Sequence, residues 1–261
     1  MTMTQIRRAG VLALVVATTT TLTACAGVVG AKMTYNDTEK AKITDIVVAG
    51  GSGDVTVETA EVTETTITRV IRRSSDPGES YRLEGSTLTI DTSCGVRCSV
   101  SYQIKTPPGV TVRGKLGSGD VRLAGIAAAD LEVGSGDLTV LNAAGPVKVQ
   151  TNSGDIRVLD AKGTVQTEAG SGDTDVINAA KAVTAKVHSG NLTVLLAEPG
   201  SVTAESGSGD IKVTVPAGSY KLITDTGSGD VDRHGMDSDA DATNVIDVKT
   251  GSGDVAVASL P

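Results

Sequence analysis

The segment GSGDLTVLNAAGPVKVQT, residues 134–151, is followed at once by two near copies of itself. NSGDIRVLDAKGTVQTEA occupies residues 152–169, and GSGDTDVINAAKAVTAKV occupies residues 170–187. After the fourth residue of each copy, apolar and polar residues alternate, a small or polar gap follows, and a second alternating run closes the unit. Alternation with a period of two, in short runs rich in β-branched residues, predicts two β-strands per unit.

The tetrapeptide GSGD marks most of the chain. It stands at 51–54, 117–120, 134–137, 170–173, 207–210, 227–230 and 251–254, with the variants NSGD at 152–155 and HSGN at 188–191. From position 120 to position 254 the fourth residues are spaced by 17, 18, 18, 18, 19, 20 and 24 residues. Units of this length bury their apolar faces by stacking on copies of themselves. We therefore predict an all-β fold, a parallel β-solenoid with coils of about 18 residues. An antiparallel sandwich or a propeller is the alternative; propeller blades need four strands and about 40 residues, so the 18-residue period fits the solenoid better.

The composition agrees with a thin core. The chain has 31 Gly, no Phe, no Trp and only four Tyr. Val, Ile, Leu and Ala must then fill the interior, which suits stacked strands. Hydrophobic residues make up 39% and charged residues 21%, and this balance argues against disorder.

The N-terminus has the features of an export signal. Arg7 and Arg8 precede the apolar run AGVLALVV, and LTAC ends at Cys25. This pattern resembles the bacterial lipoprotein signal, in which the Cys is lipidated and becomes the new N-terminus. An ordinary secretory signal with a chance Cys is the alternative, and the choice between the general and the twin-arginine export routes stays open. The expected location is the extracytoplasmic face of the cell membrane, reached through the lipid.

Four segments are expected. Residues 1–24 form the lipoprotein signal peptide, 25–42 the lipidated N-terminus and a tether, 43–116 an irregular N-terminal β part, and 117–261 the regular solenoid. In the irregular part, TETTITRVIRR and YRLEGSTLTIDTS flank the turn SSDPGES and are predicted to form an inserted strand pair. At the other end, VAVASLP is expected to close the stack as an open terminal coil.

The net charge excludes some partners. Removal of residues 1–24 takes away two of 23 basic residues and none of 31 acidic ones, so the remaining chain carries 21 − 31 = −10 charges. This balance argues against nucleic acid and against an anionic bilayer surface as direct partners. The expected partners are the membrane, through the lipid anchor, and an envelope protein or glycan that the sequence does not identify.

Two further cysteines, Cys94 and Cys98, lie close together in SCGVRC. Outside the cytoplasm such a pair usually oxidises, and we predict a disulfide that closes a small loop. A metal pair is the alternative, but the only histidines, His188 and His234, are distant in sequence.

The segment TPPGVTVRGKLGSGDV, the GSGDV repeats and the LTAC motif together resemble a bacterial β-strand-repeat family whose members carry the label "putative adhesin". The similarity covers roughly residues 43–258. The family has no known biochemical function and includes a membrane protein of an envelope-stress operon and cell-surface head domains. The resemblance implies a cell-surface β-solenoid and assigns no catalytic residue.

The fourth residue of each repeat is the clearest candidate for a site. Gly permits left-handed backbone values and Asp caps its own turn, so the motif reads first as a structural corner. Stacking would nevertheless place carboxylates about 4.8 Å apart. Either backbone N–H groups hold these charges or cations such as Ca²⁺ lie between them. Calcium-binding nonapeptide repeats, however, recur every nine residues, half the 18-residue period of this chain. No cofactor is expected, and the residues concerned are Asp54, Asp120, Asp137, Asp155, Asp173, Asp210, Asp230 and Asp254.

Other motifs give weaker signals. DTGS at 225–228 matches an aspartic-protease string, but aligned repeats place Lys115, Glu132, Glu168, Glu205 or Lys249 at the Asp225 position, which indicates a freely varying corner. DSDADATN at 237–244 resembles the start of an EF-hand loop but lacks its Gly and its final Glu. We predict that residues 237–244 form an acidic surface loop. No nucleophile accompanies either His, and we expect no enzyme.

Three function classes follow. The preferred class is a non-catalytic, adhesin-like interaction module on a lipid-anchored lipoprotein. The alternative is an accessory protein of an envelope-stress response, suggested by the family resemblance alone. A polysaccharide-acting enzyme is a third class, disfavoured because glycan grooves need aromatic platforms and a tight acid–base cluster.

Overall fold

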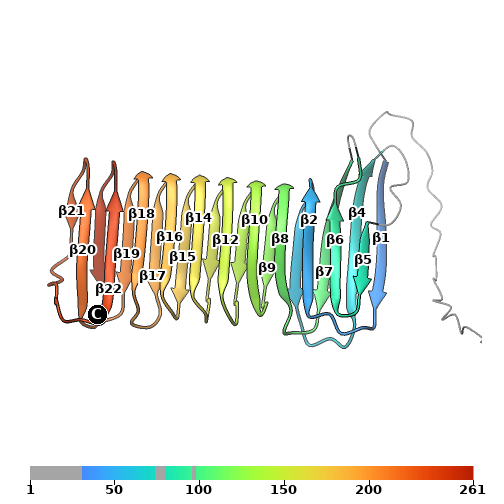
Figure 1. Cartoon of the computed structure of the whole chain (residues 1–261), viewed down its shortest axis with the longest axis horizontal. Helices are drawn as coiled ribbons and strands as arrows, with labels where there is room; N and C mark the ends of the chain where they lie inside the picture. Colours follow the sequence, from blue (N-terminus) through green and yellow to red (C-terminus); the bar gives the residue numbers. More distant parts are fainter. Residues whose placement is uncertain (1–30, 74–79, 96–97, 261) are drawn as a thin grey trace, which may run out of the picture.

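The structure, a computed structural model, describes residues 31–73, 80–95 and 98–260. These residues form two long sheets that face each other along the whole molecule (Figure 1). Sheet A has 12 strands, in the spatial order β1 (Ala31–Glu39), β4 (Thr65–Arg73), β7 (Ser99–Thr106), β3 (Val55–Thr59), β9 (Val121–Ala124), β11 (Leu138–Leu141), β13 (Ile156–Leu159), β15 (Thr174–Ala179), β17 (Leu192–Leu196), β19 (Ile211–Val215), β23 (Val255–Ser259) and β21 (Val231–Asp232).

Sheet B runs beside sheet A with 11 strands. Its spatial order is β20 (Tyr220–Thr226), β22 (Asn244–Thr250), β18 (Val202–Ser208), β16 (Val183–Ser189), β14 (Val165–Ser171), β12 (Val147–Ser153), β10 (Ala128–Ser135), β8 (Thr111–Ser118), β2 (Asp45–Gly51), β6 (Thr87–Thr92) and β5 (Tyr81–Glu84). In the part of the chain described, no helix is long and apolar enough to cross a membrane.

Each repeat contributes one strand to each sheet, and this confirms the predicted parallel β-solenoid. From β8 to β19 the chain alternates strictly between the sheets, and each strand pairs in parallel with its equivalent one coil away. The register aligns like with like, for example Leu138 with Ile156 and Val147 with Val165. The 17–19-residue spacing of the repeats therefore sets the register directly.

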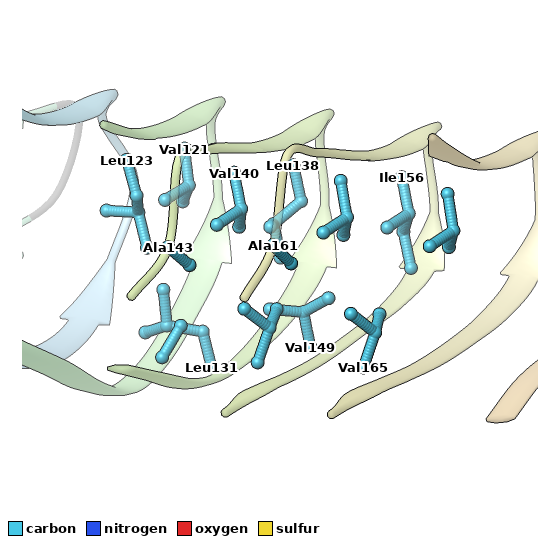
Figure 2. Packing of buried hydrophobic residues seen from close by; sticks show 14 of the residues in the cluster. Val121, Leu123, Leu131, Leu138, Val140, Ala143, Val149, Ile156, Ala161 and Val165 are labelled. Atoms are coloured by element: carbon cyan, nitrogen blue, oxygen red, sulfur yellow. The ribbon is translucent and has the colours of Figure 1, made fainter. Parts of the chain in front are cut away.

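The core is a narrow double row of aliphatic side chains. Figure 2 shows Val121, Leu138 and Ile156 of sheet A pointing toward Leu131 and Val165 of sheet B. All five are at most 2% exposed. Because every coil repeats the same inward positions, each side chain packs between its equivalents in the two neighbouring coils.

The two fully buried tyrosines lie near the ends of this core. Tyr102 is in β7 and Tyr220 is in β20, and each side chain is only 1% exposed. Tyr220 is in the last coil of the stack, while Tyr102 lies beside Val55 in the most N-terminal coil. The regular coils between them bury only aliphatic and small side chains, so the thin core accommodates rings only where the repeat ends.

The order of the coils at the ends differs from their order in the sequence. At the C-terminal end, β22 and β23 insert between the β18–β19 coil and the β20–β21 coil. At the N-terminal end, β6 and β7 lie outside β2 and β3, which contact β8 and β9. The expectation that VAVASLP ends the stack is therefore wrong, because that coil is enclosed on both sides.

Two further expectations for the N-terminal part are corrected. Residues 31–39, expected in a tether, form β1, which pairs antiparallel with β4 along its whole length. The predicted strand pair across 74–79 does not form, because β4 joins sheet A through β7 whereas β5 pairs with β6 in sheet B. Alternating apolar residues identified these strands but could not say which sheet each would join.

Candidate functional site

The GSGD corners connect a sheet B strand to a sheet A strand in each coil. The second Gly has a positive φ at every corner, from 124° at Gly119 to 155° at Gly53. A Cβ at Gly172 would lie 2.3 Å from the carbonyl oxygen of Gly154 in the preceding coil. Both the backbone angle and the close stacking therefore require glycine, and this position is Gly in every copy, including NSGD and HSGN.

The aspartates of the corners form a continuous hydrogen-bonded ladder. The backbone N–H of Asp137 donates to Oδ1 of Asp120 at 3.0 Å, and the N–H of Asp155 donates to Oδ1 of Asp137 at 2.9 Å. The ladder follows the spatial order of the coils through Asp54, Asp120, Asp137, Asp155, Asp173, Asn191, Asp210, Asp254 and Asp230.

Of the two explanations for stacked carboxylates, the geometry supplies the first. Apart from Asp230, the last residue of the ladder, each of these carboxylates accepts the backbone N–H of the next coil. Asn191 continues the ladder by accepting from Asp210 at 3.0 Å, so the acceptor oxygen rather than the charge is what the position uses. Across the described ranges, no group of three His, Cys, Asp or Glu side chains has the spacing of a metal site.

The first position of the motif faces outward from sheet B. Because it is Gly in most coils, the absence of side chains leaves a trough along the stack. Asn152 and His188 stand in this trough, and Gly170 lies between them with no side chain. The result is a groove of 410 Å³. Its rim carries Gln150, Glu168, Lys186 and Glu205, which lie beside the trough.

Beside the trough runs an outward column of charged residues. In spatial order it reads Lys115, Glu132, Gln150, Glu168, Lys186, Glu205, Lys249 and Asp225. Lys115 forms an ion pair with Glu132, and Lys186 forms one with Glu205 at 2.8 Å. The hydrogen bond and charge of Glu205 raise the pKa of Lys186 above its usual value. The strand register confirms the sequence alignment of these positions, but the interpretation as a corner is wrong, because they lie within the strands of sheet B. Neighbouring charges in the column are opposite in sign, and Gln150 separates the two glutamates Glu132 and Glu168.

The Asp225 position illustrates this correction. It lies within β20 and pairs with Lys249, and the DTGS string is thus one rung of the charged column. The acidic loop 237–244 covers the edge of β20: Ser238 Oγ accepts from the Leu222 N–H at 3.0 Å, and the Asp239 N–H donates to the Tyr220 carbonyl at 2.9 Å. A polar cover of this kind blocks pairing at an exposed edge strand.

Asp239 is held inside this loop by two donors. The Ser219 hydroxyl and the Asp241 N–H both donate to its carboxylate, and they lower its pKa. The loop therefore has a structural explanation that the EF-hand comparison did not offer.

The remaining predicted residues are placed as follows. Cys94 and Cys98 form a disulfide with their Cα atoms 5.3 Å apart. Cys25 lies outside the described residues. His188 stands in the trough, and His234 lies between β21 and the acidic loop, with Nδ1 3.4 Å from an Asp232 oxygen.

A polar cluster at the N-terminal end was not predicted from the sequence. The Arg69 guanidinium lies between the rings of Tyr35 and Tyr81, 5.1 and 5.0 Å from their centres, and its Nη2 pairs with Asp37 at 2.9 Å. The Arg69 side chain is only 12% exposed. The Tyr81 hydroxyl donates to Glu39, and burial together with this acceptor raises the Tyr81 pKa. The cluster closes the open end of the core, and its signal was hidden because Tyr35 and Asp37 were assigned to a tether.

A second outward column, on sheet A, was also missed. Leu141, Leu159, Ile177 and Leu195 stand side by side in register, each partly exposed. Their sequence neighbours Val140, Val158, Val176 and Val194 point into the core. We name these four outward residues the aliphatic column.

Comparison with known proteins supports the fold. A family model described as Toastrack DUF4097 matches residues 22–258. Among solved structures, a "putative adhesin" from Bacteroides fragilis is 18% identical, with a TM-score of 0.52 over 90% of this chain and 100% of that chain. A "putative adhesin" from Parabacteroides merdae is 14% identical, with a TM-score of 0.33 over 88% of this chain and 96% of that chain. A search of curated proteins finds no match.

Proposed function

This chain belongs to the Toastrack DUF4097 family, and we propose that it is a non-catalytic interaction module of the cell envelope. It is anchored through lipid on Cys25 at the extracytoplasmic face of the membrane. The stacked coils serve as a rigid support, and their outward side chains contact another envelope component.

The observation that carries this proposal is the aliphatic column. Outward positions of a solvent-facing strand are usually polar, as are Thr139 and Arg157 in the neighbouring column of sheet A. Four adjacent aliphatic side chains at about 4.8 Å spacing make an apolar strip on the order of 15 Å long. Apolar strips rimmed by polar residues are typical of protein–protein contacts.

The chemistry of the strip favours a protein over a glycan as the partner. Sugar-binding surfaces use exposed aromatic rings, and this strip is purely aliphatic. Three of the four tyrosines, Tyr35, Tyr81 and Tyr102, lie together at the N-terminal end, and Arg69 already stacks on two of them. A partner protein with an apolar ridge would bury the strip without needing such rings.

Photo-crosslinking in living cells tests the proposal. A photoreactive amino acid is placed at Leu159 in the strip, and at the exposed Lys105, on the outer face of sheet A but several strands away from the strip, as the control. We expect an adduct with a different protein from position 159 that disappears when Ile177→Lys is also introduced. Position 159 yielding no adduct above the unirradiated background would overturn the proposed function.

The anchor needs a separate test. Metabolic labelling with radioactive palmitate should label the wild-type chain in the membrane fraction. The Cys25→Ser variant should be unlabelled and leave that fraction. An equally labelled Cys25→Ser variant would exclude Cys25 as the lipid attachment site.

A further inference from the structure

The charged column on sheet B is complementary to itself when its direction is reversed. From the N-terminal end its signs run plus, minus, neutral, minus, plus, minus, plus and minus, over eight adjacent strands. Read backwards against itself, every charge meets the opposite charge or the amide of Gln150. The facing pairs are Lys115–Asp225, Glu132–Lys249, Gln150–Glu205 and Glu168–Lys186, and symmetry makes each of them occur twice.

The shape of the neighbouring trough is also complementary to itself when its direction is reversed. Reversed about the same centre, between β14 and β16, His188 faces Gly170 and Asn152 faces Gly207. The two side chains that protrude from the trough thus meet two positions that have no side chain. The groove of 410 Å³ lies across this centre, and a reversed copy would fill it with its own His188.

From these two independent patterns we infer that the protein forms a symmetric dimer through the outer faces of sheet B. The two-fold axis runs parallel to the strands, between β14 and β16, so the two stacks lie antiparallel. Such an axis places each residue opposite the equivalent position counted from the other end, as an isologous interface requires.

The available area is sufficient. Eight strands at about 4.8 Å spacing, each about seven residues long at 3.3 Å, give a face on the order of 800 Å² per partner. A stable interface of standard size buries about that much on each side. The dimer leaves both copies of sheet A, with the aliphatic columns, facing outward.

Two comparisons sharpen the assignment. On sheet A the same reversal would bring Arg157 opposite Lys212, two like charges, so that face is not self-complementary. On sheet B the outermost column brings Asp130 opposite Asp247. Within its own chain, however, each of these carboxylates contacts a lysine, Lys148 at 3.8 Å and Lys249 at 3.0 Å.

Charge reversal across the axis provides the test. In Lys186→Glu, the new glutamate faces Glu168 of the second copy, so two negative charges meet. In Glu168→Lys, the new lysine faces Lys186 of the second copy, so two positive charges meet. Sedimentation equilibrium of the full chain in detergent should give a dimer for the wild type. Each single variant should dissociate at least about tenfold more readily, because like charges face each other twice. An equimolar mixture of the two variants should recover the dimer, because positions 168 and 186 then face each other with opposite charges at both places where they meet.

Lys212→Glu on sheet A changes the net charge by the same amount and should leave the dimer unchanged. Circular dichroism of each variant checks that the fold is intact. A monomeric wild type at every concentration would overturn the inference, as would single variants that dimerise like the wild type. A dimer that fails to re-form in the mixture would exclude this two-fold arrangement.

Discussion

At the GSGD corners one side-chain oxygen of each Asp links its coil to the next, in addition to the backbone hydrogen bonds there. The Asp137 carboxylate accepts the Asp155 N–H at 2.9 Å, while the N–H of Asp137 itself donates to the coil before. Asn191 shows that an amide oxygen performs the same task. The function of the residue is therefore to accept a hydrogen bond, with the charge secondary.

Substitutions at Asp137 separate these two properties. Asp137→Ala removes the acceptor and should lower the free energy of unfolding by about 1 kcal/mol. Asp137→Asn keeps an acceptor oxygen and should lower the free energy of unfolding by only a few tenths of the loss in Asp137→Ala. Urea denaturation followed by circular dichroism measures both, and equal losses in the two variants would show that the charge itself is required.

Buried threonines give a second residue-scale prediction. The Thr174 hydroxyl is fully buried without a hydrogen-bond partner, whereas the Thr250 hydroxyl donates to the Gly209 carbonyl at 3.0 Å. Thr174→Val should raise stability by about 1 kcal/mol, equivalent to a melting temperature about 2–4 °C higher. The same change at Thr250 should lower stability by a similar amount. Shifts of the same sign at both sites would contradict this assignment of partners.

At the scale of strands and coils, the unexpected order at the C-terminal end avoids a contact between like charges. In sequence order, Glu205 would be followed by Asp225 and a like-charged contact would result. In the observed order Lys249 lies between them, pairing with both positions. Like charges on adjacent strands are unfavourable, so this alternation favours the arrangement in which β22 inserts before β20.

The tyrosine near the N-terminal end of the core gives a prediction for alkaline pH. Burial raises the pKa of Tyr102 from 10.0 to about 12. Between these values the unfolded chain loses the phenolic proton while the folded chain keeps it, so stability should fall as pH rises through this window. The loss should be on the order of 1 kcal/mol in urea unfolding near pH 12 relative to pH 10. Tyr102→Phe should show a weaker dependence, and an unchanged slope in that variant would assign the effect to other groups.

The sequence predicted the solenoid well because its information is local and repeated. Alternation located the strands, and the spacing of the Asp residues set their stacking. The order of the end coils was not predictable in this way, since every coil presents the same inward Val and Ile pattern and fits any neighbour. The charged column required that order to be known, and the Arg69 cluster required β1 to be recognised as a strand.

At the scale of the whole molecule, the repeat builds a straight support whose two outer faces differ. Sheet B carries alternating charges and a glycine trough, and sheet A carries the aliphatic column. The corners that drew attention in the sequence form the edge between these faces. Because the carboxylates of the corners already accept backbone N–H groups, we expect the aspartate ladder to need no cation for stability.

Thermal unfolding of the full chain in excess Ca²⁺ and in chelator tests this central claim most directly. A backbone-held ladder predicts the same melting temperature in both conditions, since an ion that does not bind the folded state cannot stabilise it. A melting temperature that rises with Ca²⁺ concentration, and that loses this rise in Asp137→Asn, would contradict it and make the corners a cation site.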